Sequence, residues 1–295
     1  MKTYLQCVPC FFRQALDAAQ MNGLSEEIQR KIINKLAVHI PSFELDNSPV
    51  EMAGYLHSLV REEIGGKDPY QRIKKESNQK ALELYPRARE EIRNSKNPLL
   101  RAIQFAVAGN IIDFGAKSGI NIDEELGKVL AMEENAISRE DAKQFDIAGF
   151  SKKLKESDTM LYIGDNAGEI VFDKLLIEEI TRLYPDLRVY FAVRGGPIIN
   201  DITEEDAEEC GIDTIATVIS SGADLPGTIL SRSDPAFVRL FHECDIVLSK
   251  GQGNFESLSS EKRPMFFLFM AKCPVIAGHV QTEVGTVLLL QNSLE

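Results

Sequence analysis

Three loops in the second half of the chain carry residue types that can hold a cation and a phosphate group. In the first loop, Asp165 and Asn166 follow the apolar segment MLYIG (160–164) directly. Their carboxylate and amide oxygens are hard donors of the kind that Mg²⁺, Mn²⁺ and similar cations accept. Glu169 comes one helical turn later, where it can join the cation shell or receive a proton. The alternative is a simple capped turn, because Asp and Asn are also favoured helix caps.

The second loop follows the apolar segment RVYFAV (188–193) and reads RGGPIIND (194–201). Its Gly pair and proline predict a tight turn that leaves Asn200 and Asp201 near the next helix start. Asp201 can therefore supply a second carboxylate to the same cation. The planar guanidinium group of Arg194 can form two parallel hydrogen bonds to phosphate oxygens. Alternatively, Arg194 is a solvent-exposed arginine at the rim of the loop.

The third loop begins with Lys250, which follows DIVLS (245–249) and precedes Gly251 and Gly253. A lysine beside exposed backbone amides suits an anion. The alternative is a glycine-rich turn with a lysine that reaches into solvent. Three polar loops of this kind together favour a site more strongly than each does alone.

The segments before these loops are short apolar runs typical of buried strands. Further runs lie at TIATVIS, FFLFMA and TVLLL (214–220, 266–271 and 286–290), and helical patterns separate several of them, for example at 170–180 and 235–244. Such alternation predicts a mostly parallel, three-layer sheet. Ligands bind at the carboxyl ends of its strands, so the three loops are expected to meet.

The first half of the chain is expected to be helical. Ser25 and Ser48 have the residue patterns of helix starts, and further helices are predicted at 70–95, 98–117 and about 139–147. We therefore expect an α/β protein in which a helical domain (1–150) packs on a Rossmann-like, metal- and phosphate-binding domain (151–295).

The composition of the chain limits the kinds of binding partner and the cellular location that we expect. A net charge of -12 argues against a protein that coats nucleic acid or an anionic membrane surface. No apolar run approaches the roughly 20 residues of a membrane span, and the start lacks a signal-peptide pattern. The odd count of 5 cysteines fits a reducing compartment, so we expect a soluble cytoplasmic protein of undetermined oligomeric state.

Read together, GDNAGE, RGGPIINDIT and SKGQGNFE resemble the damage-control phosphatase family, once called domain of unknown function 89. The resemblance extends over the whole chain. The chain also has N-terminal features typical of the microbial branch of this family: Cys7-Val8-Pro9-Cys10, Asp68-Pro69-Tyr70 and Gly109-Asn110-Ile111-Ile112-Asp113.

The resemblance implies a phosphatase that hydrolyses phosphomonoesters of small metabolites, such as phosphosugars or damaged phosphorylated metabolites, with Mg²⁺, Mn²⁺, Co²⁺ or Ni²⁺. The implied metal ligands are Asp165, Asn166 and Asp201. Implied catalytic residues are Asp165, Glu169, Lys250 and Glu256, and implied substrate contacts are Asn110, Asp113, Arg194, Asn200, Lys250 and Asn254. Direct attack by water is favoured over an aspartyl-phosphate route through Asp165, since a ligand that reacts would release the cation.

Several alternatives stay open at this point. A non-catalytic nucleotide-binding module also fits alternating strands and helices, although the glycine spacing argues against it. An S-adenosylmethionine-dependent methyltransferase is the second enzyme candidate, because GDNAGE loosely resembles a Gly-rich cofactor loop. Cys7 and Cys10 can be structural, redox-active or metal-binding, and a structural role is favoured because no strand precedes them. His279 follows a possible strand and is a candidate for lining the cleft.

Overall fold

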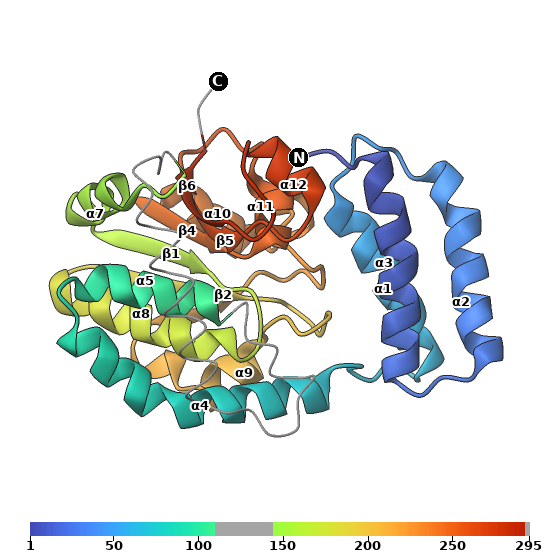
Figure 1. The fold of residues 1–295 in the computed structure, drawn as a ribbon, viewed down its shortest axis with the longest axis horizontal. Coiled ribbons are helices and arrows are strands. Elements are labelled where there is room, and N and C mark those ends of the chain that lie inside the picture. The colour runs from blue at the N-terminus through green and yellow to red at the C-terminus, as the bar shows by residue number, and fades with distance from the viewer. Residues whose placement is uncertain (110–143, 293–295) are drawn as a thin grey trace.

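The centre of the molecule is a six-stranded sheet with the strand order β3-β2-β1-β4-β5-β6 (Figure 1). This computed structural model describes residues 1–109 and 144–292. Neighbouring strands are parallel except β6, which runs antiparallel to β5. The strands are β1 (Thr159–Ile163), β2 (Arg188–Val193), β3 (Thr217–Ser220), β4 (Ile246–Lys250), β5 (Phe266–Met270) and β6 (Val287–Gln291).

Helices cover both faces of the sheet and make three layers. The first face is covered by α4 (Gln71–Asn94), α5 (Pro98–Ala108), α7 (Ile147–Lys155), α8 (Glu169–Leu183) and α9 (Glu204–Glu209). The second face is covered by α10 (Pro235–Glu243), α11 (Gln252–Leu258) and α12 (Pro274–His279). Strand side chains alternate between these cores: Met160 and Tyr162 enter the first, whereas Leu161 and Ile163 enter the second.

The N-terminal helices form a bundle with a core of its own. It contains α1 (Val8–Met21), α2 (Glu26–His39) and α3 (Pro49–Glu63), and Figure 1 shows it beside the sheet rather than over it. Ser25 accepts a hydrogen bond from Ile28 N, and Ser48 accepts one from Val50 N, so both predicted helix starts are present. The chain then returns to the sheet through α4.

The predicted α/β class with a mostly parallel sheet is confirmed, and all six apolar runs are strands. Three details differ from expectation. The helix predicted at about 139–147 is not present in its described part, because Phe145 bridges to Leu289 and α7 begins only at Ile147. The helix predicted at 98–117 is present as α5 up to Ala108, and positions 110–117 lie outside the described residues. His279 ends helix α12 instead of following a strand, and α4 and α5 share the core of the α/β layers because their apolar faces pack on α8. The division at residue 150 remains a prediction, since the packing separates only α1–α3 from the other helices.

Candidate active site

The first two loops meet at the carboxyl edge of the sheet. An antiparallel bridge pairs Asn166 with Asp201. Ala167 N donates to Asn200 O at 2.8 Å, and Ile202 N donates to Asp165 O at 3.0 Å. These backbone bonds hold the carboxylates of Asp165 and Asp201 and the amide of Asn166 beside one another, which the sequence could only suggest.

Hydrogen bonds also orient the Asn166 side chain. Its Nδ2 donates to Asp165 Oδ2 and to Glu169 Oε1, both at 2.7 Å. Because the amino end of the amide faces two carboxylates, the carbonyl oxygen Oδ1 is left as an acceptor with no donor among the described residues. The arrangement joins all three acidic and amide side chains of the GDNAGE loop.

Arg194 is an internal cation rather than an arginine on a solvated rim. Its side chain is 2% exposed, and its Nε donates to Asp201 Oδ2 at 2.6 Å. Nη1 donates to Thr228 Oγ1 at 3.0 Å, and Nη2 donates to Asn254 Oδ1 at 3.2 Å. Asn254 in turn donates to Gly164 O at 3.2 Å, so Arg194 connects the three loops.

Lys250 lies under the site with its ammonium group fully engaged. Its Nζ donates to Asp173 Oδ1 at 2.6 Å and to Ala106 O at 2.7 Å, and lies 3.5 Å from Glu169 Oε2. Tyr162 Oη also donates to Asp173 Oδ1, at 2.6 Å. The sequence analysis missed Asp173, although its position four residues after Glu169 on one helix face was a usable signal.

Negative charge exceeds positive charge in this buried cluster. The buried carboxylates are Asp165, Glu169, Asp173 and Asp201, and the cations in contact with them, among described residues, are Arg194 and Lys250. Burial raises the pKa of Glu169 to about 8 and that of Asp201 to about 7, against the opposing effects of Lys250 and Arg194.

This charge excess fits a divalent cation held by oxygen donors. No group of three His, Cys, Asp or Glu side chains suited to a metal occurs in the described part of the chain. A site here would therefore combine two carboxylates with the Asn166 amide, a donor set typical of Mg²⁺ or Mn²⁺ rather than of zinc.

Two glycines allow the loops to approach. Gly251 has a φ of +82°, and a Cβ there would lie 2.0 Å from Asp165 Oδ2. Gly168 has a φ of +83° and donates its N–H to Asn78 Oδ1 of α4 at 2.7 Å. A side chain at Gly251 would displace Asp165, so glycine is required there by both space and conformation.

The other residues predicted for the site differ in how they are placed relative to it. Asn200 takes part through its backbone oxygen, and Glu256 Oε1 accepts a hydrogen bond from Gln252 Nε2 at 2.8 Å. Asn110 and Asp113 lie outside the described residues. Of the other candidates, Cys10 is exposed, and the His279 ring packs edge-on against Phe255 at 5.9 Å.

Helix α4, which the sequence predicted without any role in the site, contacts the segments next to it. Lys74 Nζ lies 2.9 Å from Asp206 Oδ2 and 3.3 Å from Asp68 Oδ2, and its side chain is buried. Asp206 also caps α9 through Thr203. These contacts fix the segment that follows Asp201 against α4, as Asn78 fixes Gly168.

Comparisons with known proteins identify the family of the chain. The sequence model of the damage-control phosphatase ARMT1-like domain family matches residues 3–288 of this chain. The uncharacterized protein MJ0202 of Methanocaldococcus jannaschii is 34% identical, over 97% of this chain and 94% of its own length. The damage-control phosphatase PH1575 of Pyrococcus horikoshii is 30% identical over the whole of both chains.

A solved structure is similar throughout. The crystal structure of the DUF89 family protein PH1575 from Pyrococcus horikoshii has a TM-score of 0.87 and 29% identity, and covers 99% of this chain and 100% of that one. The family resemblance of the sequence motifs is therefore confirmed over the full fold. The chain belongs to the damage-control phosphatase ARMT1-like domain family and is a phosphatase.

Proposed function

We propose that this phosphatase hydrolyses phosphomonoesters of small metabolites with a divalent cation held by Asp165, Asn166 and Asp201. The observation that carries the proposal is the backbone bridge between Asn166 and Asp201, which brings oxygen donors from two separate loops to one point. A buried excess of carboxylates at that point supports the same interpretation. Mg²⁺, Mn²⁺, Co²⁺ and Ni²⁺ are the candidate cations.

When bound, the cation would supply positive charge for the phosphate and would make an attacking water more acidic. Glu169 is the candidate proton acceptor for that water, because Asn166 holds its Oε1 beside the candidate metal ligands. Arg194 would keep Asp201 oriented and offset charge on the phosphate oxygens.

Lys250 has two roles in this proposal. It holds Glu169 and Asp173 through two of its three contacts, and it places a positive charge beneath the loop. Direct contact of Nζ with a phosphate oxygen would require the ammonium group to leave one of its present acceptors. We retain attack by water over the aspartyl-phosphate route, since Asp165 is also a proposed metal ligand and a ligand that reacts would release the cation.

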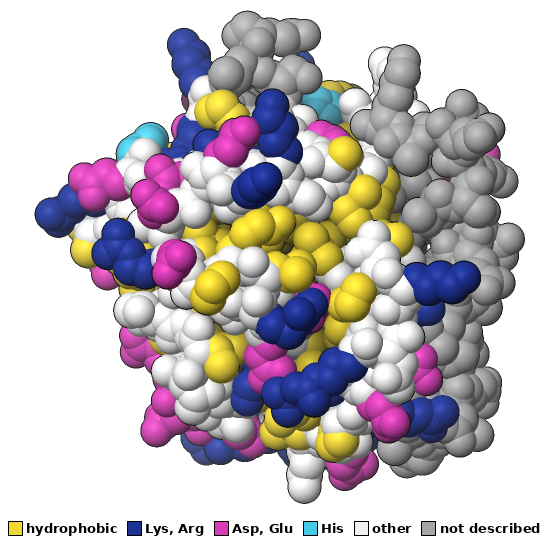
Figure 2. All heavy atoms as spheres, turned by 90° about the vertical axis from the view of Figure 1, so that its left-hand side faces the viewer, with side chains coloured by type: hydrophobic (Ala, Val, Ile, Leu, Met, Phe, Trp, Pro, Cys, Tyr) yellow, Lys and Arg dark blue, Asp and Glu magenta, His cyan; other side chains and the backbone are white. Residues whose placement is uncertain are grey.

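The substrates that we propose are phosphosugars or damaged phosphorylated metabolites in the cytoplasm. Two relatives, from Pyrococcus horikoshii and Archaeoglobus fulgidus, are named damage-control phosphatases. On the face that Figure 2 shows, the described acidic and basic side chains are intermixed, so that face offers no basic stripe for nucleic acid. Among the described residues, no helix is both long and apolar enough to cross a bilayer.

The test is phosphate release from a panel of phosphosugars and p-nitrophenyl phosphate, with each of the four cations and with a chelator. We expect activity that chelation abolishes and that Asp165→Asn lowers by about 10²–10³-fold or more. Asp186→Asn, at an exposed position, removes the same charge and should retain full activity. Chelator-insensitive turnover, or near-normal turnover by Asp165→Asn, would refute the metal site.

A further inference from the structure

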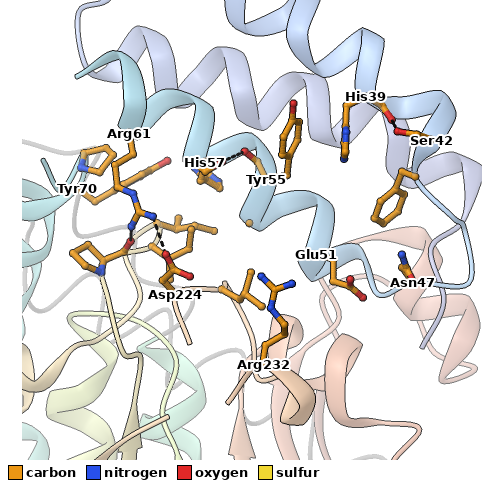
Figure 3. A pocket seen from close by; sticks show the side chains of 18 residues that line it. His39, Ser42, Asn47, Glu51, Tyr55, His57, Arg61, Tyr70, Asp224 and Arg232 are labelled. Carbon is orange, nitrogen blue, oxygen red and sulfur yellow. Dashed lines mark hydrogen bonds and ion pairs between the residues drawn. The ribbon is translucent and has the colours of Figure 1, made fainter. Parts of the chain in front are cut away.

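A cavity lies beside the candidate active site, between α3 and the loops that follow β2 and β3 (Figure 3). It measures about 450 Å³, a volume within the range of small-molecule sites. Its lining includes the outer side of Pro197–Ile199, but none of the candidate metal ligands. The cavity is adjacent to the site, because Asp201 follows Ile199 by two residues and its charge acts on Tyr70 of the lining.

His57 gives the cavity an unsatisfied polar surface. The residue is 5% exposed, and neither ring nitrogen has a hydrogen-bond partner in the described part of the chain. Its ring contacts the Tyr70 ring edge-on at 6.0 Å and lines the cavity. Burial lowers the pKa of His57 to about 4, so the ring is neutral at pH 7 and carries one donor and one acceptor. Each nitrogen can be satisfied by its own hydroxyl group, one of which accepts from the ring N–H while the other donates to the unprotonated nitrogen.

The mouth of the cavity offers positive charge. Arg232 is exposed and its side chain has no hydrogen bond or ion pair with any described residue. Figure 3 shows its guanidinium directed toward the cavity between Glu51 and Asp224. Arg61 is already occupied, since it donates to Pro197 O at 3.1 Å and to Asp224 Oδ2 at 2.8 Å. Arg232 is thus the side chain that can receive an anionic group.

The other walls suit a compact carbon skeleton. Tyr55 stacks on His39 with ring centroids 3.9 Å apart and presents an aromatic surface to the cavity. Ile199, which also lines the cavity, has a φ of +45°, a conformation that a β-branched residue adopts only when its surroundings impose it. The wall between cavity and active site is therefore a defined, strained turn and not a loose loop.

We propose that this cavity binds a small hydroxylated anion of sugar-acid or sugar-phosphate size, with a hydroxyl at His57 and the charge at Arg232. The same chemistry could belong to a separate metabolite or to part of a substrate that extends from the active site. The walls favour a separate ligand, because no candidate metal ligand lines the cavity. This proposal stands independently of metal-dependent catalysis.

The test is calorimetric titration of the full chain with D-gluconate, which has five hydroxyls and one negative charge. Sorbitol and acetate serve as comparison probes that lack the charge and the hydroxyls, respectively. We expect saturable gluconate binding that His57→Phe weakens about tenfold, as loss of a buried hydrogen bond would. Arg232→Gln should weaken it about threefold, while the exposed Arg239→Gln, which removes an equal charge outside the cavity, should leave it unchanged.

Each outcome decides the proposal. Absence of saturable gluconate binding overturns it, as does equal binding by wild type and Arg232→Gln, a surface change that leaves the fold intact. A thermal melt shows whether His57→Phe is folded. Retained binding by Asp165→Asn supports a separate site, whereas its loss would assign the ligand to the active site and overturn the independent cavity. Phosphatase assays of Asp165→Asn report on the proposed function separately.

Discussion

Two buried charge clusters lie side by side at the carboxyl edge of the sheet and use their carboxylates differently. The lysine cluster contains Lys250, Asp173, Tyr162 and Glu169, and the lysine ammonium has an acceptor for each of its three donors. The arginine cluster contains Arg194, Asp165, Asn166 and Asp201.

In the arginine cluster some oxygens remain available. Arg194 contacts Asp201 through Oδ2, and no hydrogen bond from a described residue reaches Asp201 Oδ1 or Asn166 Oδ1. The lysine cluster also contains an oxygen without a partner among the described residues, Asp173 Oδ2, but that atom is fully buried. The comparison indicates that the enclosed cluster supports the structure, whereas the cluster whose free oxygens include that of the partly exposed Asn166 can bind an external cation. The following predictions separate these two roles.

The largest effect on stability is expected from Lys250→Met. Removal of the ammonium leaves Asp173 and Glu169 buried without their main cation, which typically costs about 3–5 kcal/mol. The free energy of unfolding from urea titration measures this cost. The double variant Lys250→Met with Asp173→Asn should recover part of it, because Asn can still accept from Tyr162 Oη. A loss below about 1 kcal/mol in the single variant would contradict a supporting role for the lysine cluster.

A cation should stabilise the protein through the arginine cluster. At a Mn²⁺ concentration of about 100 Kd, binding to the folded state adds about 2.7 kcal/mol to the free energy of unfolding. Asp201→Asn should remove this increment because it deletes one carboxylate donor, and Asp186→Asn should keep it. Urea titrations with and without Mn²⁺ measure the difference. An increment that survives Asp201→Asn would place the cation elsewhere.

The sequence predicted those parts of the fold that depend on local patterns. β2 coincides with the apolar run at 188–193, and α8 and α10 begin within one residue of the helical patterns at 170–180 and 235–244. Apolar runs and caps are properties of a few adjacent residues, so they can be read directly. The carboxyl-edge location of the three loops followed from the parallel strands alone.

Long-range pairings were not predictable in the same way. Nothing in the sequence specifies that Lys250 contacts Asp173, or that Asn78 of α4 accepts from Gly168 N. Both contacts depend on how α4, α5 and α8 pack, which is set by tertiary geometry and not by residue spacing. For the same reason Arg194 could be interpreted as a rim residue, although the fold buries it between Asp201 and Asn254.

The smallest effect on stability is expected at the ion pair between Arg61 of the N-terminal bundle and Asp224 of the loop that follows β3. Arg61 Nη2 lies 2.8 Å from Asp224 Oδ2, but the two side chains are 30% and 52% exposed. Exposed pairs contribute less than about 1 kcal/mol, so Asp224→Asn should destabilise the protein by no more than that. In 1 M NaCl, where the screening length is about 3 Å, the difference from wild type should vanish. Lys250→Met should keep its large cost at the same salt concentration, because water and ions do not reach Asp173. Equal salt sensitivity of the two variants would mean that the lysine cluster is open to solvent.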